Sequence, residues 1–159
     1  MLNPIDADRV ICDGGATGRF PDEIHPGVAW WMAACYVVTA RADRLVVAYD
    51  GQAATAEFFD RMCLGAINAQ HYACLVLDRG VADRDELLAA MKELDRVPSM
   101  YAATSNGTAT ITLYDRDGAP LTERTGLHLI RRMIAEDRVP IPVNDGCKGR
   151  IQRYEEVVR

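Results

Sequence analysis

Three hydroxyls and one amide gather between two apolar runs of the sequence, in the segment Thr104-Ser105-Asn106-Gly107-Thr108. The flanking runs are typical of strands, and the glycine beside the polar residues lets the backbone turn. A segment of this kind either joins two strands tightly or holds a reactive hydroxyl out to a substrate. Thr104 and Ser105 are the residues that could supply that hydroxyl, and the residue types alone leave both interpretations open.

Two other small, polar, glycine-bearing segments share this chemistry, at Asp13 to Arg19 and at Asp50 to Thr55. Each follows an apolar run that is predicted to be a strand. Ligands of α/β sheets bind at the carboxyl ends of the strands, so three such segments at one edge indicate a phosphate or sugar site. Glycine and aspartate are also what tight strand-to-helix turns require, and the sequence is equally compatible with this second interpretation.

The elements that must position these segments alternate along the chain. Apolar runs predict strands, and apolar residues at helical spacing predict helices between them. The predicted strands are 9–12, 44–49, 72–77 and two within 99–122, the second being 109–114; the predicted helices are 26–42, 53–70, 83–94 and 122–136. This alternation is typical of an α/β fold, here a mixed sheet of about four strands flanked by helices on both faces. The strand 109–114 is expected to run antiparallel to its predecessor, because only a short loop joins them.

The composition is that of one soluble globular domain spanning residues 1–159, with 49% hydrophobic and 26% charged residues. The formal net charge is -5 and no basic patch stands out, so we expect neither a nucleic acid nor an anionic membrane as a partner. The first residues do not resemble a signal peptide, and the longest apolar run, 28–40, is too short to span a bilayer.

Five cysteines are present, an odd number without a CxxC pair, which predicts reduced thiols in a cytoplasmic protein. The three histidines, His25, His71 and His128, fall on separate predicted elements. Neither residue type completes a metal-binding pattern, so the sequence predicts no metal site within the chain.

The order of several short stretches resembles that of a known enzyme family. These stretches are ICDGGATG at 11–18, AYDGQAAT at 48–55, DRGVA at 78–82, AATSNG at 102–107, ITLYDRDG at 111–118 and GRIQRYEEVV from Gly149. Together they resemble the first domain of the α-D-phosphohexomutases, which include the phosphoglucomutases and phosphomannomutases. The likeness covers nearly the whole chain and implies that family's domain I fold, with three layers. The tail 139–159 resembles the exit from that domain toward a second one.

In this family a serine in the loop that resembles 102–107 carries the phosphoryl group exchanged with a sugar phosphate, and another domain binds the metal ion. The resemblance therefore makes Thr104 and Ser105 candidate phosphoryl carriers. Aligning Asn106 with the family's asparagine selects Thr104, and a shift of one residue selects Ser105. Candidate binding residues are Arg19, Asp50, Asn106 and Gly107, with a hexose phosphate as a weak ligand. No cofactor is expected within the chain, and magnesium only if other domains are supplied.

The sequence also departs from the family pattern. The loop lacks the family's histidine and proline, and two loop arginines of the family fall at Tyr49 and Gln52. Positive charge stabilises a transferring phosphoryl group, and the family's metal, sugar and phosphate motifs are also missing. We therefore expect a degenerate domain without autonomous mutase activity, a binding or oligomerising module that forms a homodimer. The alternative is a catalytic fragment that acts when other domains are supplied.

Overall fold

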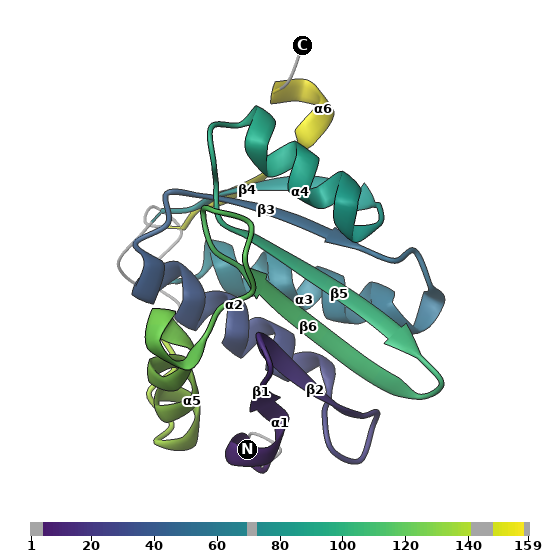
Figure 1. Ribbon diagram of the computed structural model, residues 1–159, viewed down its shortest axis with the longest axis vertical. Helices are drawn as coiled ribbons and strands as arrows, with labels where there is room; N and C mark the ends of the chain where they lie inside the picture. Colours follow the sequence, from purple (N-terminus) through teal and green to yellow (C-terminus); the bar gives the residue numbers. More distant parts are fainter. Residues whose placement is uncertain (1–4, 70–72, 141–147, 158–159) are drawn as a thin grey trace.

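The computed structural model describes residues 5–69, 73–140 and 148–157, and it places seven strands in one mixed sheet (Figure 1). The strand order is β1-β2-β6-β5-β3-β4-β7. The strands are β1 (Ile11–Cys12), β2 (Gly15–Arg19), β3 (Arg44–Tyr49), β4 (Leu75–Val81), β5 (Ser99–Ser105), β6 (Thr108–Tyr114) and β7 (Arg150–Arg153).

The strand directions give the sheet one edge at which most of its strands end. Strands β5, β3, β4 and β7 run parallel to one another, whereas β6 runs antiparallel to both β5 and β2. Strands β2, β3, β4, β5 and β7 therefore all end at the same edge, which we call the carboxyl edge. The predicted antiparallel pairing of the strand 109–114 with its predecessor is confirmed.

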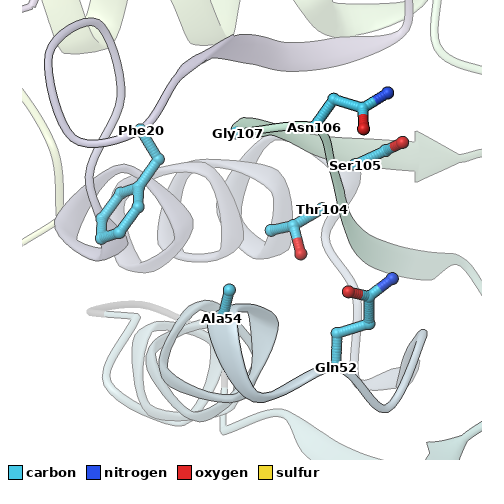
Figure 2. A pocket seen from close by; sticks show the side chains of 7 residues that line it. All are labelled: Phe20, Gln52, Ala54, Thr104, Ser105, Asn106 and Gly107. Carbon is cyan, nitrogen blue, oxygen red and sulfur yellow. The ribbon is translucent and has the colours of Figure 1, made fainter.

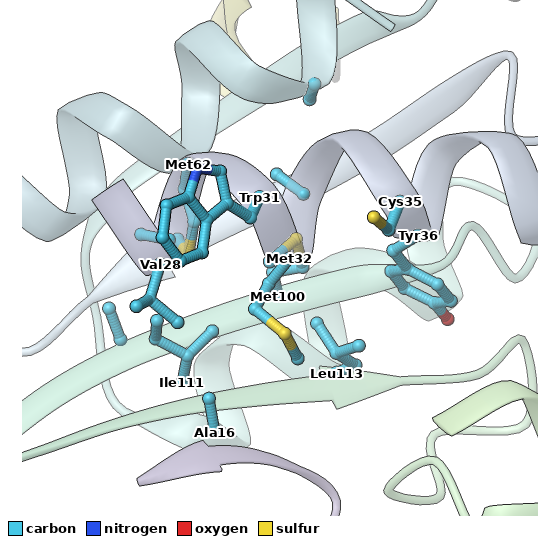
Figure 3. Close-up of a cluster of buried hydrophobic side chains, with 14 of the residues drawn as sticks. Ala16, Val28, Trp31, Met32, Cys35, Tyr36, Met62, Met100, Ile111 and Leu113 are labelled. Atoms are coloured by element: carbon cyan, nitrogen blue, oxygen red, sulfur yellow. The ribbon is translucent and has the colours of Figure 1, made fainter. Parts of the chain in front are cut away.

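Helices cover both faces of the sheet, which confirms the predicted α/β class. Helices α2 (Pro26–Ala40) and α3 (Ala53–Ile67) pack on one face with side chains such as Met100 and Ile111. Figure 3 shows this larger core, in which Trp31 and Met32 of α2 lie over the strands. Helix α4 (Arg84–Glu93) packs on the other face against alternate strand residues, including Val46 and Leu77.

The helices begin where the sequence offers caps. His25 is the N-cap of α2, where its Nδ1 accepts a hydrogen bond from the N–H of Gly27, and Pro26 occupies the first turn. Asp83, where the sequence predicted a helix to begin, caps α4 in a capping box with Glu86. The predicted helix 122–136 is broken by Gly126, whose φ of 140° separates η1 (Glu123–Leu127) from α5 (His128–Ala135).

The predicted number of about four strands is too low, because both ends of the chain add strands to the central four. At the amino end, the predicted strand 9–12 is a short helix, α1 (Ala7–Val10), capped by Asp6 and followed by β1. The glycine-bearing segment Asp13 to Arg19, which the sequence did not predict to be a strand, contains β2, and β2 pairs with β6. In the tail, β7 pairs with β4 and leads into α6 (Tyr154–Val157). Residue 72, the predicted start of one strand, and residues 141–147 of the tail lie outside the described residues.

No helix in the described ranges is both long and apolar enough to cross a membrane. Four cysteines lie in those ranges as free thiols, and Cys35, Cys63 and Cys74 are buried. Burial raises the pKa of Cys35 and of Cys74 to about 12, so these thiols stay protonated and unreactive at neutral pH.

Candidate functional site

The segment 104–108 is a tight hairpin turn that joins β5 and β6. Ser105 pairs directly with Thr108, which leaves only Asn106 and Gly107 in the loop. Both loop residues have positive φ, 52° for Asn106 and 78° for Gly107. An Asn-Gly pair with this backbone is the favoured two-residue hairpin connection. Of the two interpretations that the sequence left open, the structure therefore shows the tight connection.

Thr104, the first candidate carrier, is held inside the fold. Its hydroxyl lies 2.8 Å from the hydroxyl of Thr55 on α3, and the residue is only 9% exposed. Its backbone N–H donates to Oδ2 of Asp50 at 2.9 Å. In Figure 2 the Thr104 hydroxyl points toward α3. Both polar groups of Thr104 are therefore engaged by the protein itself.

Ser105, the second candidate, lies on the opposite side of the strand. It is exposed, and its side chain points away from Thr104 (Figure 2). Among the described residues no partner for its hydroxyl is found. Ser105 is thus the accessible hydroxyl at this strand end, which the sequence alone could not decide.

Asp50 connects the ends of β3 and β5. Its Oδ1 accepts the N–H of Gln52 at 3.0 Å, and its Oδ2 accepts the N–H of Thr104. A half-buried carboxylate therefore occupies backbone donors that a bound phosphate would otherwise use. Asp50 is a predicted binding residue, and the structure places it in contact with Thr104, two residues before the Asn106-Gly107 turn.

Arg19, the other predicted binding residue, ends β2 at the same edge. It pairs with Thr108, and the next residue, Phe20, donates its N–H to the carbonyl of Gly107 at 2.9 Å. The Arg19 side chain is 72% exposed, and its Nε lies 3.6 Å from Oε1 of Glu23. Glu23 also accepts the Arg19 N–H, and this bond, together with the charges of Arg9 and Arg19, lowers the pKa of Glu23.

A hollow of about 150 Å³ lies beside the hairpin turn between β5 and β6 (Figure 2). Its lining consists of Phe20, Gln52, Ala54 and the four residues from Thr104 to Gly107. Sequence reasoning missed Phe20 and Gln52. Gln52 lies within the polar segment 50–55 but was not singled out as a binding residue, and the type of Phe20 carries no such signal. The pairing of β2 with β6 and the start of α3 bring both residues to the hollow.

The three polar segments do not all meet at the carboxyl edge. Asp50 and the hairpin lie there, and so does the Arg19 end of the first segment. The turn at Asp13 and Gly14 lies at the opposite edge, where the Gly14 carbonyl accepts the N–H of Leu113 at 2.9 Å. The expected row of three segments is therefore wrong for Gly14 and Gly15, at the start of the first segment.

A second hollow of about 360 Å³ lies farther along the carboxyl edge, at the ends of β4 and β7. Asp78, Arg79 and Arg153 are among the residues that line it. Desolvation raises the pKa of Asp78, which favours its neutral form. Val81, at the end of β4, lies against Gly51, which follows β3. Ligands of α/β sheets commonly bind in the crevice outside the carboxyl ends of such neighbouring strands.

Within the described ranges, no three His, Cys, Asp or Glu side chains gather as metal ligands.

No protein-family model matches the sequence, and no curated protein matches it. Solved structures do share the fold. A phosphoglucomutase/phosphomannomutase family protein from Burkholderia thailandensis superposes with a TM-score of 0.75 at 15% identity, over 95% of this chain and 34% of that one. A protein from Thermus thermophilus assigned as a phosphomannomutase gives a TM-score of 0.64 at 14% identity, over 87% of this chain and 31% of that one. The fold is that of a phosphoglucomutase/phosphomannomutase domain.

The chain spans about a third of the length of each of these phosphohexomutase-type proteins. This coverage is that of a single domain of the larger proteins. The fold expected from the resemblance is thereby confirmed, whereas the roles of Thr104, Ser105 and the binding residues stay predictions.

Proposed function

We propose that this chain is a phosphohexomutase-type domain of the cytoplasm that binds hexose derivatives weakly and has no mutase activity of its own. The observation that carries this proposal is the state of Thr104, whose hydroxyl bonds to Thr55 and whose N–H bonds to Asp50. A phosphoryl carrier needs a free hydroxyl and free backbone donors around it. Thr104 has neither.

The rest of the hollow supports the same proposal. Phosphoryl transfer is driven mainly by positioning and by positive charge around the transferring group. Among the residues that the structure describes, no charged side chain lines the hollow, and Arg19, at the adjacent strand end, is paired with Glu23. Any hexose phosphate is therefore expected to bind at best in the millimolar range.

The alternative is a catalytic fragment that becomes active when other domains and magnesium are supplied. The exposed hydroxyl of Ser105 favours this alternative, because it is the candidate carrier that a partner could reach. The tight Asn106-Gly107 turn weighs against it, since no loop remains to carry the hydroxyl toward a substrate.

A coupled mutase assay with magnesium and a bisphosphate activator tests the proposal. We expect no interconversion of glucose or mannose 1- and 6-phosphates by the chain alone. Turnover that disappears in the Thr104→Ala, Ser105→Ala double variant would contradict it. In that case the single variants Thr104→Ala and Ser105→Ala would identify the carrier. We would expect it to be Ser105, because its hydroxyl is exposed.

A further inference from the structure

We propose that the hollow beside Phe20 prefers an uncharged hexose ring to the corresponding phosphate ester, and that Asp50 sets this preference. The inference rests on the proposed function and deepens it by naming the ligand class. It concerns the hollow formed by Phe20, Gln52, Ala54 and residues 104–107.

The lining of the hollow carries neutral polar groups only. Gln52 and Asn106 carry amides, each of which donates and accepts hydrogen bonds. The Gln52 side chain does not cap α3, so its amide is not used for that purpose. Neutral groups that both donate and accept match the hydroxyls of a sugar ring, whereas they offer no counter-charge to a phosphate.

One wall of the hollow is aromatic. Phe20 is 39% exposed, and its ring packs edge-on against Phe58 with 5.4 Å between the ring centroids. The hydrogen bond from the Phe20 N–H to Gly107 holds the residue beside the hairpin. An aromatic side chain next to amides suits a ligand that is apolar on one side and polar at its rim, as a pyranose ring is.

The size of the hollow limits the ligand to one ring. Sites for drug-sized molecules occupy about 300–1,000 Å³. This hollow, at about 150 Å³, is smaller than that range. A single monosaccharide is therefore the largest ligand that we expect it to hold.

Asp50 disfavours an anion at the same place. Its carboxylate bonds to the backbone N–H groups of Gln52 and Thr104, which are both lining residues. It therefore occupies two donors and adds negative charge beside the hollow. Arg19, the cation at the adjacent strand end, compensates little, because it does not line the hollow and its side chain is 72% exposed to solvent, which screens its charge.

The test is a set of amide NMR titrations of the full chain with D-glucose, glucose 6-phosphate and inorganic phosphate. We expect glucose to shift the amides of Phe20, Asn106 and Gly107 at lower concentrations than glucose 6-phosphate does. In Asp50→Asn, the ratio of the two affinities should move toward the phosphate ester by about tenfold, since a nearby like charge is removed. Asp117→Asn removes the same charge at the opposite edge and should leave the ratio unchanged.

A second variant keeps the test decisive if Asp50→Asn does not fold. Phe20→Leu retains an apolar side chain against Phe58 but removes the aromatic wall, so it should weaken glucose binding several-fold and leave inorganic phosphate unaffected. Tighter binding of glucose 6-phosphate than of glucose by the unmodified chain would overturn the preference alone. Absence of shifts with every probe would overturn it together with the binding part of the proposed function.

Discussion

A hydrogen bond between the hydroxyls of Thr55 and Thr104 joins α3 to the end of β5. Thr55 is fully buried, so its hydroxyl depends on Thr104 for a partner. Thr104→Val should lower the free energy of unfolding by about 1–3 kcal/mol, because it leaves a buried polar group unpaired. Urea denaturation of the variant measures this loss.

The double variant Thr55→Val, Thr104→Val should recover part of that stability, since both polar groups are then replaced by apolar groups of the same shape. Thr108→Val is the matched control on the neighbouring strand, because its hydroxyl has no partner among the described residues. Equal effects of Thr104→Val and Thr108→Val would show that the bond to Thr55 contributes nothing.

At the scale of elements, the strands and helices that apolar periodicity defines were predicted from the sequence. A strand that forms by pairing with a distant part of the chain, such as β2, was missed. The run 44–49 and the helix beginning at residue 53 follow directly from apolar spacing. The segment 13–18 was predicted to be a loop because glycine has low strand propensity. Gly15 is required there for another reason, since a Cβ would lie 1.9 Å from the carbonyl oxygen of Ile111 on β6.

The candidate site was only partly predictable for the same physical reason. Asn106 and Gly107 are typical of a hairpin turn, but the residue types of 104–108 also allowed a loop that holds a reactive hydroxyl out to a substrate. The bond between Asp50 and Thr104 joins residues 54 positions apart, and only the parallel pairing of β3 with β5 brings them together. No local pattern contains that contact, although it decides whether the threonine is free to react.

The packing of α2 on α3 gives a prediction at this scale. The two helices approach so closely that a Cβ on Gly65 would lie 2.3 Å from the carbonyl oxygen of Trp30. Gly65→Ala should therefore destabilise the fold by about 1–3 kcal/mol through overpacking. This loss should exceed the gain of about 1 kcal/mol that alanine brings to a helix.

Glu57→Ala, on the exposed face of the same helix, is the control and should change stability little, because its ion pair with Arg61 is on the surface. Thermal unfolding followed by circular dichroism compares the two variants. A midpoint for Gly65→Ala at or above that of the unmodified chain would show that the helices can move apart without cost.

At the scale of the whole molecule, the outer end of the sheet is the surface that we expect to mediate self-association. Ile151 on β7 is 43% exposed and pairs in register with Val76 of β4. Because Val76 packs in the core that contains α3, Ile151 lies on that same face of the sheet. Leu64 of α3 is equally exposed. Arg150 and Arg153 at the two ends of β7 disfavour extension of the sheet into a neighbouring copy, because antiparallel pairing would oppose like charges.

We therefore expect a homodimer that buries Leu64 and Ile151 by face-to-face contact rather than by strand pairing. In sedimentation velocity, Ile151→Glu and Leu64→Glu should each shift the unmodified chain's dimer toward monomer. Leu129→Glu alters a side chain of similar exposure, 47%, on α5 and should not change the distribution. A monomeric unmodified chain at high protein concentration would rule out the dimer. An effect of Leu129→Glu equal to that of Ile151→Glu would place the contact elsewhere, because α5 lies at the other end of the sheet (Figure 1).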